Sequence, residues 1–178
     1  MNIYKDKAIK LFNQIIFSGF ENFSSKLLSD EIKHIPVFIL GPPRSGSTLL
    51  MQCLISQLDF CYITNLTHKY FFGSPFLSEM IFPKTRYFVN NFNSKYGVTK
   101  GWAGPHEASN WWYRFFEREP RYTYKNIINM KKMNKFKASV RLLTYFSNKT
   151  VIFKNPHSSL RLNPISSLFP NALYLRLF

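Results

Sequence analysis

The segment from Val37 to Leu50 constrains the fold of this chain more than any other stretch. Residues 37–40 are all apolar and favour β structure, a turn rich in proline and glycine follows, and a helix-compatible run begins at Ser47. A short strand that is apolar on both faces is typical of the interior of a parallel sheet, whose strands need helical crossovers. The segment therefore predicts a strand, a tight loop and a helix in an α/β, three-layer fold with a central parallel sheet flanked by helices.

The turn in this segment is suited to holding an oxyanion such as phosphate, because backbone N–H groups and a helix N-terminus converge there. Gly41 and Gly46 have the spacing of the nucleotide-binding phosphate loop (P-loop) G-x-x-x-x-G-K-[ST]. Where that loop has a lysine that reaches the β- and γ-phosphates, this chain has Ser47, and the only cation inside the turn is Arg44. The turn is P-loop-like, and a nucleoside triphosphate is a disfavoured ligand.

Two separate motifs resemble those of one enzyme family. The sequence PPRSGSTLL at residues 42–50 resembles the 5′-phosphosulfate loop of sulfotransferases that use 3′-phosphoadenosine 5′-phosphosulfate (PAPS). The likeness is to the branch with the pattern P-R-S-G-[ST]-T-L, which includes protein-tyrosine sulfotransferases and many bacterial enzymes. Downstream, VIFKNP at residues 151–156 and LFPNALYL at residues 168–175 are similar to the family's strand-K-[ND]-P segment and its next strand. Together the motifs frame most of the chain.

The resemblance implies transfer of a sulfuryl group from PAPS to a hydroxyl or amine of an unidentified acceptor. It places Arg44 and Lys154 near the leaving oxygen, and each follows an expected strand at the sheet edge where ligands of parallel α/β proteins bind. No metal is expected, because cations already hold the leaving phosphate. The residues expected to bind this nucleotide are Pro43, Arg44, Ser45, Gly46, Ser47, Thr48 and Lys154.

Two other interpretations stay open. A P-loop nucleotide kinase or NTPase is weakened by Ser47 and by the lack of an acidic pair spaced to hold Mg²⁺. A catalytically inactive nucleotide-binding remnant of the fold is the third possibility. In the family, the strand matching residues 172–178 runs into an Arg-Asp-Pro-like turn whose arginine, with a later serine, holds the 3′-phosphate. Since the sequence ends at Phe178, we expect a single incomplete domain over residues 1–178, with its C-terminal part missing.

The general base is less clearly marked. In the tyrosine-sulfating relatives a glutamate follows the second strand, and an ungapped count puts Asn65 near that place. Because an asparagine cannot take a proton, we expect the base in the pair His106 and Glu107, with His68 as the alternative. Glu107 would equally suit the first turn of a helix, where the dipole favours a carboxylate. The nearby aromatic residues either wall an acceptor pocket or form core: Trp102, Trp111, Trp112, Tyr113, Phe115 and Phe116.

Composition indicates a globular chain with a sizeable core, since 46% of its 178 residues are hydrophobic. The net charge of +15 fits a solvated helix face, an anionic membrane or an anionic ligand; no nucleic-acid-binding signature accompanies it. No apolar run approaches the roughly 20 residues of a transmembrane segment, and no signal peptide is evident. We expect a cytoplasmic protein, without a disulfide or metal site at Cys53 and Cys61. Oligomeric state is not indicated.

The remaining pattern places helices and strands along the chain. Helices are expected over residues 3–28, 47–58, 107–117 and 124–146, and short helices between residues 67 and 94. Strands are expected over residues 37–40, 60–63, 151–153 and 173–178. The helix over 124–146 carries the densest basic group: Lys125, Lys131, Lys132, Lys135, Lys137 and Arg141.

Overall fold

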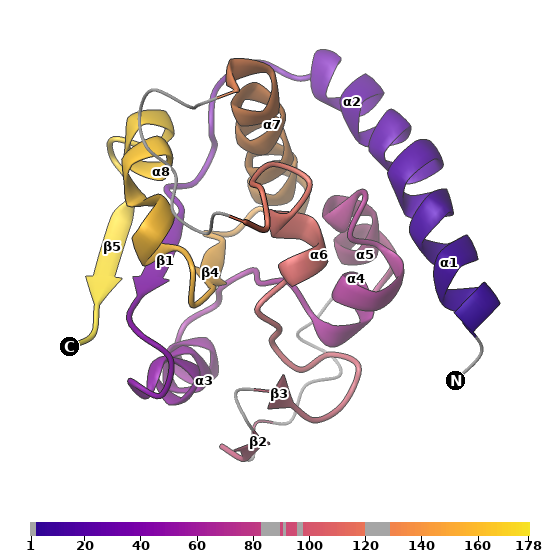
Figure 1. Cartoon of the computed structure of the whole chain (residues 1–178). Helices are drawn as coiled ribbons and strands as arrows, with labels where there is room; N and C mark the ends of the chain where they lie inside the picture. Colours follow the sequence, from indigo (N-terminus) through magenta and orange to yellow (C-terminus); the bar gives the residue numbers. More distant parts are fainter. Residues whose placement is uncertain (1–2, 83–89, 91, 96–97, 120–128) are drawn as a thin grey trace.

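The main sheet of the described chain has three parallel strands and lies toward one side of the molecule, with β5 (Leu173–Arg176) at its outer edge (Figure 1). We describe it from a computed structural model, in which residues 3–82, 90, 92–95, 98–119 and 129–178 are described. Strand β1 (Val37–Leu40) lies between β4 (Ile152–Lys154) and β5 and pairs in parallel with both. The predicted central parallel strand and the α/β class are confirmed.

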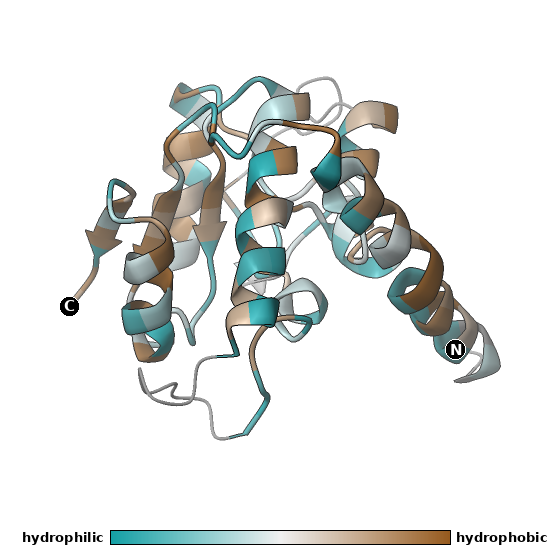
Figure 2. Ribbon diagram, turned by 90° about the horizontal axis from the view of Figure 1, so that it is seen from above, coloured by the Kyte–Doolittle hydropathy of each residue, from teal (hydrophilic) through white to brown (hydrophobic). Residues whose placement is uncertain are grey.

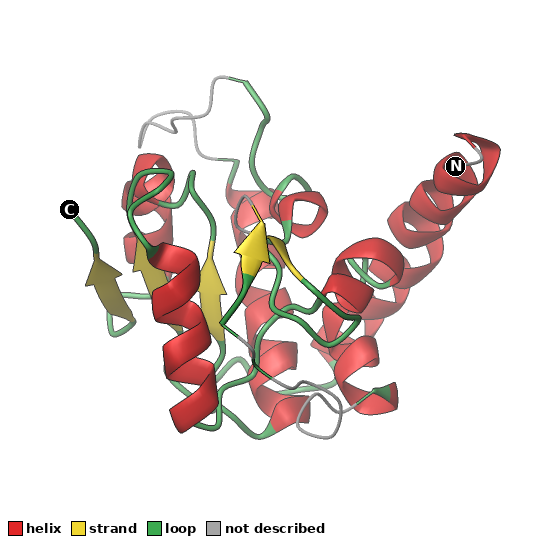
Figure 3. Ribbon diagram, turned by 90° about the horizontal axis from the view of Figure 1, so that it is seen from below, coloured by secondary structure: helices red, strands yellow, loops and turns green. Residues whose placement is uncertain are grey.

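The two faces of β1 carry different hydrophobic clusters, because successive side chains of a strand point to opposite sides. Val37 and Ile39 pack with Met51 of helix α3 (Ser47–Gln57) on one face. Phe38 and Leu40 belong to a larger cluster with α7 (Met130–Ser147) and α8 (Leu162–Leu168) on the other face. Helices therefore cover both faces of the sheet (Figure 3).

Aromatic rings fill the larger cluster. The Phe38 ring lies 5.3 Å from that of Phe153 and 5.7 Å from that of Tyr174, and Trp111 stacks on Phe153 at 5.0 Å. The aromatic run after Glu107 is therefore mostly core. Its buried members are Trp111, Trp112, Phe115 and Phe116. Trp102, which precedes this run, is 58% exposed and does not belong to the core.

The N-terminal helix is confirmed from Ile3 to Lys26, two residues short of the predicted end. It has three parts: α1 (Ile3–Phe12), the π-helical turn η1 (Asn13–Phe17) and α2 (Ser18–Lys26). It runs along the side of the molecule remote from β5 (Figure 1). No helix among the described residues has both the length and the apolar content needed to cross a membrane.

Two predicted elements differ from the structure. Residues 60–63 form only an isolated parallel bridge, between Cys61 and Val151, beside β4. The helix predicted over residues 107–117 is wrong in extent, because α6 covers Ser109–Trp112 only. Ala108 has a left-handed backbone (φ 59°), which a continuing right-handed helix excludes. Glu107 therefore precedes α6 instead of occupying its first turn.

The other elements complete the chain. Helix α7 begins at Met130, where the Asn129 side chain accepts a hydrogen bond from the N–H of Lys132 (3.1 Å). Residues 124–128 of the predicted long helix, with Lys125, lie outside the described residues. The short elements are α4 (Asn65–Tyr70), α5 (Pro75–Ile81), the hairpin β2 (Ser94–Lys95) and β3 (Val98–Thr99), and the 3₁₀ turn η4 (Ser159–Arg161).

Candidate active site

The loop after β1 is tightly folded around its two glycines. Gly41 donates its N–H to Ser159 Oγ (3.1 Å), and a Cβ at this position would lie 2.7 Å from Ser45 Oγ. Gly46 has a φ of 80°, a conformation that favours glycine, and Arg44 shares it with a φ of 72°. The spacing of the two glycines thus has a structural cause in this loop.

The N-terminal end of α3 presents unpaired donors to an anion. The first helical hydrogen bond that closes here runs from Leu50 N–H to the Gly46 carbonyl (2.9 Å). The N–H groups of the preceding first turn therefore have no partner inside the helix. Ser45 Oγ is buried and makes no hydrogen bond within the described part of the chain. An anion bound at the start of α3 would satisfy the N–H groups of its first turn.

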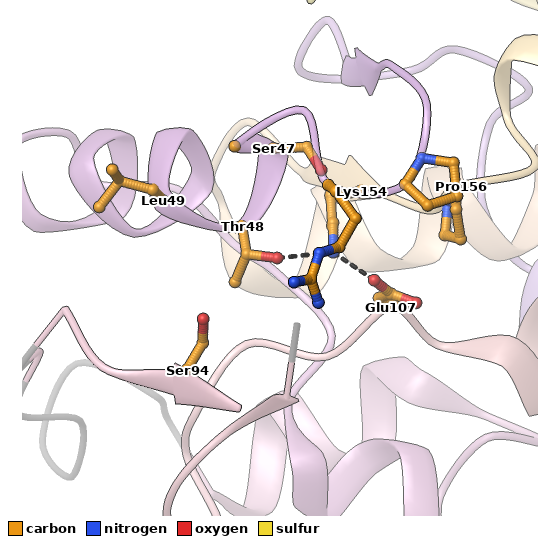
Figure 4. A pocket seen from close by; sticks show the side chains of 10 residues that line it. Ser47, Thr48, Leu49, Ser94, Glu107, Lys154 and Pro156 are labelled. Carbon is orange, nitrogen blue, oxygen red and sulfur yellow. Dashed lines mark hydrogen bonds and ion pairs between the residues drawn. The ribbon is translucent and has the colours of Figure 1, made fainter. Parts of the chain in front are cut away.

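Lys154 is the second cation of the site. Its β4 position pairs with Ile39 of β1, so it stands beside the strand that enters the loop. Its side chain is only 6% exposed, donates to Thr48 Oγ1 (2.8 Å) and forms an ion pair with Glu107 (Figure 4). A lysine at the end of a strand is often exposed to solvent, whereas the Lys154 side chain is buried between a hydroxyl and a carboxylate.

Glu107 reaches Lys154 from a connection that is held by backbone and side-chain contacts. Upstream, Thr64 and Pro105 form an isolated antiparallel bridge. The Asn155 side chain donates to the Glu107 carbonyl (3.0 Å), which ties this connection to the end of β4. The Glu107 side chain is 29% exposed, so part of its carboxylate remains accessible while Lys154 holds it.

Arg44, Glu107 and Lys154 line one cavity of about 670 Å³. Its other lining residues are Pro43, Gly46, Ser47, Thr48, Leu49, Ser94 and Pro156 (Figure 4). Of the residues expected from the sequence, Ser45 and His106 do not line this cavity. Sequence reasoning missed Ser94 and Ser159, and no motif in the sequence marks either residue.

The two histidines proposed as bases lie against each other. The rings of His68 and His106 stack with centroids 3.7 Å apart and planes 12° apart. His106 Nδ1 accepts the N–H of Ala108 (2.8 Å), so the proton of a neutral His106 ring is on Nε2. Asn65 has a structural role, because its amide donates to the carbonyls of Thr99 (2.9 Å) and Gly101 (2.7 Å).

Both histidines are neutral near physiological pH. Burial, with a smaller contribution from the neighbouring His106, lowers the pKa of His68 to about 3. Burial also lowers the pKa of His106; Glu107 opposes this shift and Lys154 adds to it. Among the described residues, no three His, Cys, Asp or Glu side chains are grouped so that they could hold a metal ion.

The structure is that of an α/β protein. A loop suited to binding an anion follows its central strand β1, and a buried lysine ends the neighbouring strand β4. Comparison with known proteins gives the family. A family model described as the sulfotransferase family matches residues 36–178, and the chain therefore belongs to that family. The comparison finds no matching curated protein and no matching solved structure.

The lowered pKa of His68 predicts a loss of stability in acid. Its ordinary pKa is 6.5 and its pKa in the folded protein is about 3, so between these values the unfolded chain binds a proton that the folded protein does not. The free energy of unfolding should therefore be unaffected by this ring above pH 6.5. It should fall as the pH is lowered, by up to about 1.4 kcal/mol per pH unit.

Urea unfolding at a series of pH values checks this effect. His68→Phe, which retains a ring beside His106 but cannot titrate, should reduce the acid dependence. His34→Phe is the control and should retain the wild-type dependence, because His34 lies elsewhere and contacts Asn148. If the free energy of unfolding falls equally with decreasing pH in the wild type and in His68→Phe, His68 does not titrate as described.

Proposed function

We propose that this protein transfers a sulfuryl group from PAPS to a hydroxyl or amine acceptor. The observation that carries the proposal is the position of Lys154, which contacts both Thr48 at the start of α3 and Glu107 in the cavity that Arg44 also lines. Two cations, a loop rich in backbone donors and one accessible carboxylate are the groups that such a transfer requires.

The anion loop is a suitable binding site for the 5′ end of the nucleotide. The amides of residues 46–48, with the hydroxyls of Ser47 and Thr48 that line the cavity, would hold the 5′-phosphate. PAPS supplies the sulfuryl group when bound. When the bond between sulfur and the bridging oxygen breaks, this oxygen leaves with the 5′-phosphate and becomes more negative. Arg44 and Lys154 would stabilise that negative charge.

Glu107 is the general base in this proposal. It would accept the acceptor's proton as the new sulfur–oxygen or sulfur–nitrogen bond forms. Its carboxylate lines the cavity and is held in place by Lys154, whereas His106 does not line the cavity and its Nδ1 lone pair is engaged by Ala108 N–H. A base must lie within hydrogen-bond reach of the proton that it removes, which favours Glu107 over His106.

Nucleotide binding separates this proposal from a kinase or NTPase. The protein should bind 3′,5′-bisphosphoadenosine without added metal more tightly than it binds ATP with Mg²⁺, because Ser47 replaces the lysine that reaches the terminal phosphates. Calorimetric titration of both ligands measures this preference. Tighter, magnesium-dependent binding of ATP would contradict the proposal and favour phosphoryl chemistry.

Removing either cation should impair turnover. Arg44→Ala or Lys154→Ala is expected to lower kcat by about 10²–10³-fold, the usual effect of removing one transition-state donor. Formation of 3′,5′-bisphosphoadenosine, measured with phenol, alcohol and amine acceptors, gives the rate. Lys149→Ala, which removes another ion-paired lysine (2.6 Å from Asp59), is the matched control and should retain activity. Near-wild-type rates in both cation variants would remove these residues from the reaction.

Glu107→Gln should also lower kcat, by about 10²–10⁴-fold for loss of a general base. Its affinity for 3′,5′-bisphosphoadenosine should be retained or increase, because Lys154 loses a competing carboxylate. Glu117→Gln, at another glutamate paired with a lysine, is the matched control. If His106→Phe abolishes turnover and Glu107→Gln does not, the base is His106 and the assignment is wrong.

A further inference from the structure

The N-terminal helix exposes an unusual number of large apolar side chains. Along residues 3–28 the exposed fractions are highest for Tyr4 (81%), Leu27 (70%), Ile15 (60%) and Phe23 (60%). The others are Leu11, Phe12, Ile16 and Phe20, each 46–59% exposed. We call these eight side chains the outer apolar face. Figure 2 shows the helix extending away from the body of the molecule with hydrophobic residues along its length.

The residues that this helix buries are polar. Asn13, Glu21 and Ser24 are its buried members, with exposed fractions of 1%, 3% and 9%. Glu21 accepts from Ser139 Oγ (2.7 Å) and pairs with Arg114, and Asn13 donates to the Tyr70 carbonyl (2.8 Å). A surface helix normally turns its apolar residues to the core and its polar residues to solvent. Here the most buried residues are polar, and although Phe17 stacks on Phe71 and Phe20 on Phe76, packing within the fold leaves most of the outer apolar face uncovered.

The apolar residues recur along the whole helix. Leu11, Phe12, Ile15, Ile16, Phe20 and Phe23 follow one another at short intervals across the π-helical turn over Asn13–Phe17, where the rings of Phe12 and Phe17 are 4.8 Å apart. Further exposed apolar side chains lie near the helix: Met80, Ile81 and Phe82, at the end of α5, are 43–57% exposed. Ring contacts from Phe17 to Phe71 (5.4 Å) and from Phe71 to Phe82 (6.1 Å) connect the helix to this region.

Positive charge accompanies the outer apolar face. Residues 1–28 contain four lysines and two acids, and one of these acids, Glu21, is buried against Arg114. Lys7, Lys10 and Lys26 are exposed on the helix, where Asp6 is the exposed acid. The whole chain has a net charge of +15. Association of two such faces would bring like charges together, whereas an anionic surface would be attracted to them.

We propose that the outer apolar face docks on the surface of an anionic phospholipid bilayer, with the helix lying in the interface. A helix with apolar and aromatic residues on one face and lysines beside it binds bilayers in this way, through apolar burial and attraction to anionic headgroups. The outer apolar face runs along a helix that extends from the body of the molecule, so the whole face can contact a flat surface such as a bilayer. This proposal is independent of the sulfuryl transfer proposed above.

Sedimentation with vesicles tests the proposal on the whole chain. The protein should bind vesicles of phosphatidylcholine and phosphatidylserine more tightly than vesicles of phosphatidylcholine alone. Salt at about 1 M, where the Debye length is about 3 Å, should reduce this difference. Ile15→Ser with Phe23→Ser should lower binding by about tenfold or more for each side chain removed. Lys7→Glu with Lys10→Glu should lower binding to the anionic vesicles only.

Matched controls separate the face from general effects of substitution. Leu58→Ser with Leu173→Ser removes two apolar side chains of similar exposure, 51% just after α3 and 59% on β5. Lys131→Glu with Lys137→Glu makes the same change of charge on α7. Both should bind like the wild type. Equal losses in test and control pairs, or no binding of the wild-type chain to anionic vesicles, would overturn the proposal. So would a dimer that only Ile15→Ser with Phe23→Ser dissociates, because the occupant would then be a second copy.

Discussion

The register between β1 and β4 determines where Lys154 meets the other residues of the candidate active site. Because Ile39 pairs with Lys154, the lysine arrives at the level where β1 gives way to the Gly41 loop. From there its ammonium group reaches Thr48 at the start of α3 and Glu107 on a third segment. A slip of one residue would turn Lys154 to the opposite face of the sheet and would separate all three groups.

The sequence was sufficient for the parts of the site that depend on local patterns. The loop follows from its glycine spacing and flanking strand and helix, and Lys154 follows from a second motif at a strand end. The position of Glu107 could not be obtained in this way. It depends on the left-handed backbone of Ala108 and on the Asn155 bond to the Glu107 carbonyl, a contact between residues distant in the sequence. Helix propensity alone had predicted a helix starting at Glu107.

The contact between His68 and His106 is a second case of a contact between distant residues that local sequence patterns did not predict. Both residues were candidates for one role, on separate segments, and nothing in the sequence indicated that their rings would stack 3.7 Å apart. Burial holds both rings neutral, so His106 can accept the Ala108 N–H and His68 can pack on it without charge repulsion. The pair therefore supports the connection that carries Glu107, through packing as well as hydrogen bonding.

The N-terminal helix lies outside residues 36–178, which match the sulfotransferase family, yet polar side chains join it to the rest of the molecule. Asn13 donates to the Tyr70 carbonyl and accepts the Gly73 N–H (2.9 Å), just after the helix that carries His68. A Cβ at Gly73 would lie 2.1 Å from the Asn13 carbonyl oxygen, so only glycine permits this approach. Because these polar contacts and the rings of Phe17 and Phe20 hold the helix against the rest of the molecule, its position is set while most of its large apolar side chains stay exposed.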